Sequence, residues 1–275
     1  MKILPLLSAL LVPTLALLGC ASPPTAIDRP AASSAPPAPV ASPEPAVKPE
    51  PKDVLKQMAT HIRSLERFTV RVEKTTELIL PTEQRLHADQ TVEIAIQRPN
   101  RLRANYHNLS GGRLIFYDGK TFAIYTPEPN VYASAAAPPT LDETLDRLAD
   151  HYKISMPIAD LLAADPQSRL VQNLQSSTYV GRTLVRGVVC HHLAFQTSEV
   201  DWEIWIEDGP KLLPRRLVLT DKSVEGSPQM TASLIDWNLA PQFPADYFTF
   251  VPPQNAQKIA FLADLPAAQP TKATQ

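Results

Sequence analysis

The 275-residue sequence has little glycine, little cysteine and no excess of charge of either sign. Its 26 basic and 28 acidic residues give a net charge of −2, so it lacks the positive field that binds nucleic acid. Its two cysteines are too few for a disulfide scaffold or for a four-cysteine zinc site. The composition therefore argues against a nucleic-acid partner, a disulfide-rich fold and a structural zinc site.

Sequence motifs of common enzymes are absent as well. No G-x-S-x-G, H-E-x-x-H or G-x-G-x-x-G pattern occurs. Residues 119–121, Gly-Lys-Thr, resemble the end of a phosphate-binding loop, but Leu114 occupies the position of its first glycine. The sequence thus predicts a protein that is not an enzyme and that carries no metal or cofactor.

Cys190-His191-His192 is the densest cluster of potential metal ligands or catalytic groups. On a strand, alternate side chains point to opposite faces, so Cys190 and His192 share one face and His191 takes the other. Two ligands do not complete a metal site, although His151 or His107 could supply a third. A nucleophilic Cys190 needs a base in contact with it. We expect a buried cysteine beside partly buried histidines; the weaker alternative is a hydrolase that uses Cys190 or His192.

The first twenty residues predict an export signal with a lipid attachment site. A basic start precedes an uncharged apolar run over residues 3–18, as in a secretory signal peptide. The run ends in Leu-Leu-Gly-Cys, which resembles the lipobox of bacterial lipoproteins, where the peptidase cuts before the cysteine and the cysteine carries acyl chains. We expect residues 1–19 to be removed and Cys20 to anchor the protein in a membrane. A spanning helix is the competing interpretation, and two prolines within the run argue against it.

The residues after Cys20 predict a location and a stalk. By the enteric sorting rule, an aspartate directly after the lipidated cysteine retains a lipoprotein at the inner membrane. Ala21 occupies that position, so we expect the protein at the outer membrane, with its domain facing the periplasm. Residues 20–52 contain ten prolines and almost no large apolar side chain. Such a segment is expected to stay disordered and extended, because it buries too little surface to offset its ordering entropy. Residues 263–275 are expected to form a disordered tail.

Residues 53–262 are predicted to form one domain that combines helices with an antiparallel sheet. Apolar residues recur at helical spacing after Asp53, which is placed as an N-cap. Alternation with a period of two follows from Phe68 and again from Tyr179, which is typical of strands. Between these regions, residues 140–148 and 156–162 are predicted helices. Because strands and helices do not alternate regularly, the pattern indicates an α+β fold with a single sheet.

Several segments of this domain resemble an uncharacterised bacterial family of predicted periplasmic proteins. They are YDGKTFAIYTPEPNVYA, TLDETLDRLADHY, MPIADLL, YVGRTLVRGVVCHHLAF, DWEIWIEDGPKLLPRRLVLT and FVPPQNAQKI. This family is similar in turn to the LolA/LolB-like lipoprotein carriers, whose fold is an open, strongly curved antiparallel half-barrel. The resemblance implies that the N-terminal helix and the central helical insertion lie on the concave side of the sheet.

The resemblance also implies a function by analogy. The protein is expected to be non-enzymatic and to bind a lipid or lipoprotein acyl chains in a hydrophobic cavity. No lipid-contact motif can be carried over residue by residue. The candidates for the cavity are therefore large apolar side chains of the predicted strands: Phe116, Phe122, Phe195, Trp202 and Ile204. The alternative function is an envelope sensor or assembly module that binds a protein partner with the same half-barrel.

Overall fold

The computed structural model describes residues 48–107, 111–152, 154, 156–163, 166 and 170–264. The expected signal peptide, Cys20, the stalk as far as residue 47 and the tail from residue 265 lie outside these residues. No helix of the described part is long and apolar enough to cross a membrane.

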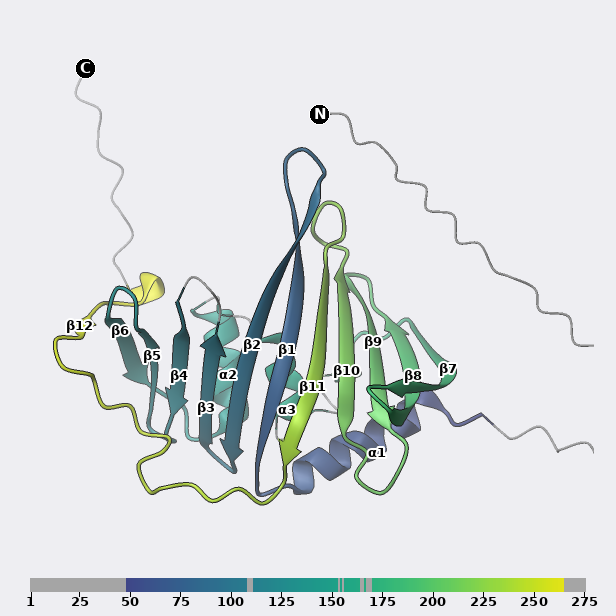
Figure 1. Ribbon diagram of the computed structural model, residues 1–275, viewed down its shortest axis with the longest axis horizontal. Coiled ribbons are helices and arrows are strands. Elements are labelled where there is room, and N and C mark those ends of the chain that lie inside the picture. The colour runs from purple at the N-terminus through teal and green to yellow at the C-terminus, as the bar shows by residue number, and fades with distance from the viewer. Residues whose placement is uncertain are drawn as a thin grey trace, which may run out of the picture. The chain divides into compact units, whose positions relative to one another are not determined.

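One open, curved sheet of twelve strands forms the framework of the described part (Figure 1). The strands before the helical insertion are β1 (Arg67–Ile79), β2 (Arg85–Gln97), β3 (Arg101–His107), β4 (Arg113–Tyr117), β5 (Thr121–Thr126) and β6 (Val131–Ala136). Those after it are β7 (Ser176–Val185), β8 (Val188–Gln196), β9 (Val200–Glu207), β10 (Pro214–Asp221), β11 (Gln229–Asn238) and β12 (Gln257–Lys258). Their order is β12-β6-β5-β4-β3-β2-β1-β11-β10-β9-β8-β7.

Neighbouring strands are antiparallel throughout, except that the short β12 runs parallel to β6. The two series of hairpins meet where β1 pairs with β11, with Val72 opposite Leu234. The predicted α+β fold with a single curved antiparallel sheet is therefore confirmed.

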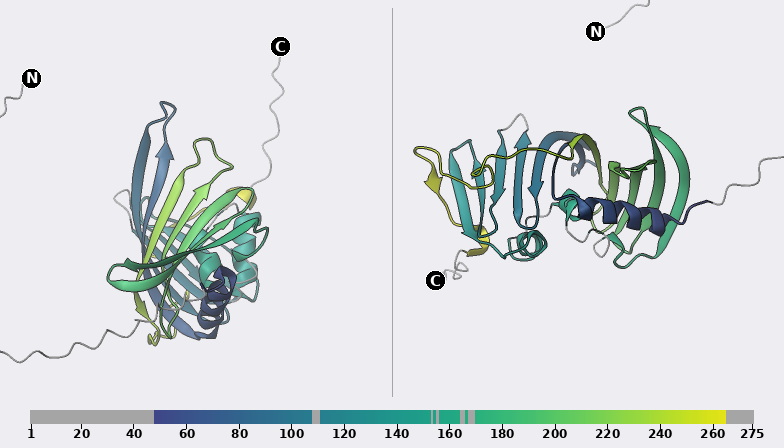
Figure 2. Two further views of the ribbon diagram at one scale, coloured as in Figure 1. Left: turned by 90° about the vertical axis from the view of Figure 1, so that its right-hand side faces the viewer. Right: turned by 90° about the horizontal axis from the view of Figure 1, so that it is seen from below.

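Helix α1 (Pro51–Ser64) lies across the concave side of the sheet (Figure 2). It begins three residues earlier than the sequence pattern predicts, because a proline fits the first turn of a helix, where its missing N–H is not needed. Asp53 consequently lies in the first turn and is not the N-cap. One face of the helix, formed by Val54, Leu55, Met58 and Ile62, is buried against the sheet.

The helical insertion between β6 and β7 contains α2 (Leu141–Asp150) and α3 (Pro157–Leu162), which lie on the same side of the sheet as α1 (Figure 2). The predicted capping box begins α2: the Thr140 Oγ1 accepts a hydrogen bond from the Glu143 N–H at 3.3 Å and donates one to the Glu143 carboxylate at 2.7 Å. Leu141, Leu145 and Leu148 form the buried face of α2.

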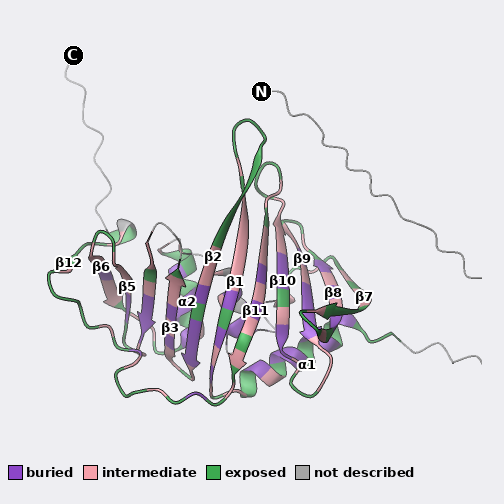
Figure 3. Ribbon diagram, in the orientation of Figure 1, coloured by how far each residue is buried: buried purple, intermediate pink, exposed green. Residues whose placement is uncertain are grey.

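The core lies between the concave face of the sheet and these helices. Phe68, Val70 and Val72 of β1 are all buried there, as the period of two requires, whereas the residues between them face the convex side. Figure 3 shows this burial concentrated along the central strands and α1. The chain after β11 runs along the edge of the sheet to β12, and Phe250 in this segment contacts Phe116 of the convex face.

Arg98, directly after β2, holds two helix ends together. Its half-buried guanidinium donates hydrogen bonds to the carbonyl oxygens of Ile62 and Leu65 at the end of α1, at 3.3 and 3.2 Å. It also donates to the carbonyl oxygens of Leu162 and Ala163 at the end of α3, both at 3.0 Å. The Ile62 carbonyl also accepts from the Leu65 N–H at 3.3 Å, and a cation is favourable at the carbonyl end of a helix. One side chain therefore fastens α1 and α3 to the sheet.

We predict that Arg98→Met lowers the free energy of unfolding by about 3 kcal/mol, because it leaves helix-end carbonyls without their charged donor. Urea unfolding followed by circular dichroism measures this loss. Arg101→Met, at an arginine with no hydrogen bond or ion pair among the described residues, is the matched control and should shift the midpoint little. Equal losses in the two variants would contradict the role of Arg98.

Candidate functional site

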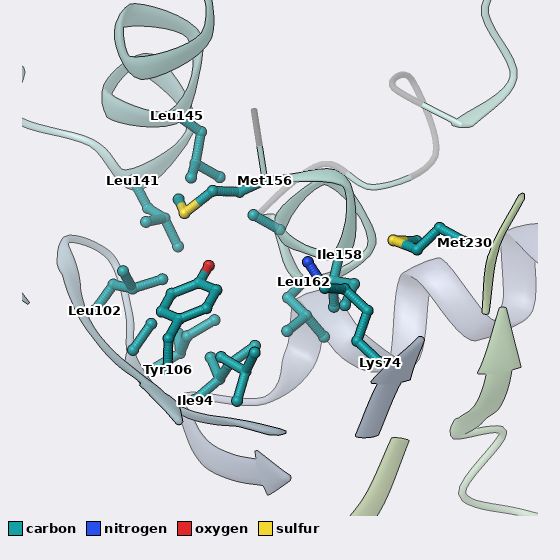
Figure 4. A pocket seen from close by; sticks show the side chains of 14 residues that line it. Lys74, Ile94, Leu102, Tyr106, Leu141, Leu145, Met156, Ile158, Leu162 and Met230 are labelled. Carbon is teal, nitrogen blue, oxygen red and sulfur yellow. The ribbon is translucent and has the colours of Figure 1, made fainter. Parts of the chain in front are cut away.

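The concave face of the sheet contains an apolar pocket under α2 and α3 (Figure 4). It has a volume of about 70 Å³. Strands β1, β2, β3 and β11 form its floor, and α2, α3 and Met156 cover it. The lining residues are Lys74, Val92, Ile94, Ile96, Leu102, Ala104, Tyr106, Leu141, Leu145, Met156, Ile158, Ala159, Leu162 and Met230.

The strand period explains this lining. Val92, Ile94 and Ile96 alternate along β2, and Ile94 lies opposite Ala104 of β3. Because alternate side chains share one face, these residues form a continuous aliphatic floor. Ala104 and, on the covering helix, Ala159 are small, so they fill little of the space between the layers. The pocket is thus a direct result of strand alternation combined with two small residues.

Lys74 and Tyr106 bring polar atoms to this otherwise apolar wall. Figure 4 shows their tips directed into the space between the strands and the helices. Burial lowers the pKa of the Lys74 ammonium and raises the pKa of the Tyr106 hydroxyl, the latter opposed by the nearby Arg113. Among the residues that the structure describes, neither the ammonium nor the hydroxyl has a hydrogen-bond or ion-pair partner. Both groups are therefore available to a ligand.

A second, more polar cavity of about 320 Å³ adjoins the apolar pocket. Lys74, Tyr106 and Met156 line both cavities and form the border between them. Arg113 of β4 and Gln90 of β2 also line the second cavity, which we call the vestibule. The site therefore passes from an aliphatic pocket to an adjoining cavity that contains two basic side chains.

The size of the apolar pocket limits what it holds in this conformation. Pockets that enclose a small molecule have volumes of about 300–1,000 Å³, whereas this one has about 70 Å³. An acyl chain therefore requires α2 and α3 to move away from the sheet. The last turn of α3 is held by Arg98, but Met156, before its first turn, has no side-chain cap. The Met156 end, which borders the vestibule, thus has no side-chain attachment of this kind.

The five cavity residues expected from the sequence lie outside this pocket. Phe116 points to the convex face, where it contacts Phe250 at a ring distance of 5.4 Å, because it is out of phase with the concave residues of β4. Phe122 is on the concave face but farther along the sheet, against Tyr152 and Phe261. Their size made them candidates, whereas position along the strand order decides which residues line the pocket.

The other three candidates lie in the second half of the sheet, where Trp202 lines a separate cavity of about 320 Å³ together with Leu217 and Leu219. Phe195 and Trp202 stack on each other at 4.2 Å, and Ile204 is fully buried beside them. They belong to β8 and β9, which contact α1, whereas the pocket lies under α2 and α3. The lining of the pocket thus has to be assigned to β1–β3 and β11 instead.

Cys190 and His192 share the convex face, as strand alternation predicts, and His191 takes the other. The Cys190 thiol donates to the Val188 carbonyl at 3.5 Å, while His192 lies 2.6 Å from the Glu203 carboxylate and stacks on Trp205. Burial raises the pKa of Cys190 to about 11. This cysteine is therefore a protonated, buried side chain and not an activated nucleophile. Within the described residues no three His, Cys, Asp or Glu side chains are grouped as metal ligands.

Sequence reasoning missed Lys74, although a signal for it exists. Val70, Val72 and Lys74 are consecutive concave positions of β1, so the alternation that identifies the core also places a lysine on its face. A charged residue in phase with a buried apolar series is unusual, because burial of a charge is costly. Such a residue marks a functional position more specifically than a large aromatic side chain does.

Comparison with known proteins gives one family and several solved structures. A family model described as "Predicted periplasmic protein (DUF2092)" matches residues 52–262. A search of curated proteins finds no match. An uncharacterised conserved protein from Thermus thermophilus aligns over 76% of this chain and 98% of its own, with 9% identity and a TM-score of 0.47.

Two further solved structures align over similar lengths. The Mycobacterium tuberculosis lipoprotein LppX aligns over 70% of this chain and 96% of its own, with 10% identity and a TM-score of 0.44. A LolA superfamily protein from Nitrosomonas europaea aligns over 73% of this chain and 97% of its own, with 13% identity and a TM-score of 0.39.

The raised pKa of Cys190 gives a testable result. At pH 8 a pKa of about 11 in place of 9.0 reduces the thiolate fraction about a hundredfold, and burial also blocks access. We expect iodoacetamide to label Cys190 at least a hundredfold more slowly in the folded protein than in urea, as measured by mass spectrometry of the peptide that contains it. Rapid labelling of the folded protein would revive the catalytic interpretation.

Proposed function

The chain belongs to the DUF2092 family of predicted periplasmic proteins, and we propose that it is a non-enzymatic envelope protein that holds an acyl chain of a lipid or a lipoprotein. The acyl chain lies between the central strands and helices α2 and α3. The observation that supports this most directly is the pocket itself, which is lined almost entirely by aliphatic side chains on the concave face.

The short helices α2 and α3 that cover the pocket support the same proposal. Helix α3 has six residues and α2 has ten, so each buries only a short apolar face. Short helices packed mainly through such faces separate from a sheet at modest cost, and the apolar surface that is exposed is covered again by the chain of the ligand. The pocket is thus suited to enlarge around an acyl chain instead of remaining a fixed void.

The proposal includes a membrane anchor. Cys20 is proposed to carry the lipid, and the proline-rich residues 21–50 to connect it to α1. At about 3.1 Å per residue this connection reaches on the order of 90 Å when extended. A domain so tethered, with the outer membrane as the proposed location, meets lipids or lipoproteins in the periplasm without being inserted itself.

Metabolic labelling tests the anchor. Radiolabelled palmitate should be incorporated into the protein, and Cys20→Ser should abolish the label because the only acylation site is removed. Cys190→Ser is the matched control and should retain it, since Cys190 is buried in the folded domain. Label that persists in the Cys20 variant would refute lipidation at this position.

A pocket-filling substitution tests the acyl site. Ala159→Phe introduces a ring between α3 and the sheet, and we expect it to weaken binding of a fluorescent fatty acid at least tenfold, because it occupies the space for the chain. Ala149→Phe is the matched control on the exposed face of α2 and should bind as the native protein does. Fluorescence titration gives both affinities, and circular dichroism verifies that both variants fold.

A protein partner is the second candidate function, and the free edge of β7 favours it. Within the described part of the chain, β7 pairs only with β8, and its Val180 and Leu184 are exposed. Unpaired strand edges add a strand from another chain. If the native protein binds no fatty acid and native mass spectrometry of material from the envelope instead shows a stoichiometric protein, this second function replaces the first.

A further inference from the structure

We infer that the site selects acyl chains that end in an anionic headgroup, with Lys74 and Arg113 binding the carboxylate or phosphate in the vestibule. This inference rests on the proposed function, because it assigns the chemical class of the ligand that enters the pocket. It goes further in predicting a preference for charge that an apolar cavity alone does not produce.

The first argument is the position of Lys74. It follows Val70 and Val72 on the concave face of β1, and its cross-strand neighbours on that face are Gln90 of β2 and Ala232 of β11. No carboxylate of the described residues pairs with its ammonium. A half-buried cation without a counter-ion is unfavourable, and an anion supplied by a ligand removes that penalty.

The second argument is the placement of Arg113. It lines the vestibule together with Lys74, and it is close enough to Tyr106 to lower the pKa of that hydroxyl. Within the described residues its guanidinium has no ion pair either. A guanidinium presents paired N–H donors that match the oxygens of a carboxylate or a phosphate. Arg113 is exposed, so water solvates it without a counter-ion, and what it adds is a second positive charge beside the half-buried Lys74. Two cations that line one cavity favour an anion there.

The third argument is the order of these groups along the site. Lys74 and Tyr106 line both the apolar pocket and the vestibule, so their polar tips stand where a chain ends and a headgroup begins. The aliphatic part of the lysine side chain lies along the pocket wall while its ammonium reaches the border. The Tyr106 hydroxyl adds a donor to the same anion.

Among the described residues, the acidic side chain of Glu128 is close to the vestibule. Glu128 lies beside Gly111, where a Cβ would approach its carboxylate oxygen to 3.9 Å. It does not line the vestibule, whereas both basic residues do. The charge that faces a bound headgroup is therefore positive.

Paired ligands with the same chain and different heads test the inference. We would use the mature-length chain, residues 20–275 with Cys20→Ser, which contains all of the described residues and carries no lipid of its own. Dodecanoate below its critical micelle concentration and dodecanol below its solubility limit displace the neutral dye N-phenyl-1-naphthylamine from the pocket. We expect dodecanoate to bind about tenfold more tightly than dodecanol, as one charge-assisted contact provides.

Variants assign this preference to the basic residues. Lys74→Met and Arg113→Met should each lower the affinity for dodecanoate about tenfold and leave that for dodecanol unchanged. Lys74→Arg should retain the preference, and Lys120→Met, at an exposed lysine in the β4–β5 turn, should behave as the unsubstituted protein.

In the unsubstituted protein, added salt should weaken the binding of dodecanoate and not that of dodecanol. This result does not depend on how the variants fold.

The outcomes separate the inference from the function on which it rests. Equal affinity for the two ligands, or no salt effect on dodecanoate, overturns the anion site while acyl binding stands. Absence of binding by both ligands overturns the proposed function and this inference together.

Lysophosphatidylglycerol and lysophosphatidylcholine with the same chain identify the source of the anion. Tight binding of lysophosphatidylglycerol alone supports the phosphate of an anionic phospholipid. A preference for dodecanoate over both lysophospholipids supports a fatty-acid carboxylate.

Discussion

The arrangement of the helices over the sheet depends on the hydrogen bonds of one arginine. Arg98 leaves the sheet at the end of β2 and donates to carbonyl oxygens at the ends of both α1 and α3. Helices α1 and α3 also contact each other, and the arginine adds a charged donor that both helix ends share. Its Nη2 donates to Ile62, Leu162 and Ala163 and its Nε donates to Leu65, whereas Nη1 is buried with no partner among the described residues.

The position of this attachment shapes the pocket. Because Arg98 holds the carboxyl end of α3, that end stays close to β2, while the Met156 end lies above the border between pocket and vestibule. Of the two covering helices, α3 is thus held at its carboxyl end, and its Met156 end has no side-chain cap. In the proposed function, an acyl chain that enters from the vestibule would meet the Met156 end first, with the aliphatic floor of β2 and β3 beyond it.

The sequence alone predicts the sheet and its faces well, because alternation is a local property. Val70, Val72 and the partners of β2 are assigned correctly from their spacing, as are the capping box at Thr140 and the opposite faces of Cys190 and His191. The pocket is not predictable in this way. It depends on which strands lie under α2 and α3, and this depends on the order of twelve strands, which no local pattern contains. Phe195 and Trp202, which were chosen for their size, lie on strands that contact α1, and Trp202 lines a different cavity.

The central position of β1 has a consequence for how the chain acquires its structure. One edge of β1 pairs with β2, the next strand in the sequence, but the other pairs with β11, where Val72 and Leu234 are about 160 residues apart. If the chain crosses a membrane from its N-terminus, as a periplasmic protein does, β1 emerges long before its second partner. Its open edge and apolar face remain exposed during that interval, which is a state prone to pairing with other chains. Closure of so long a loop also slows folding. The sheet is completed only when the last fifth of the chain has arrived, so the strand order itself sets how long this edge stays unpaired.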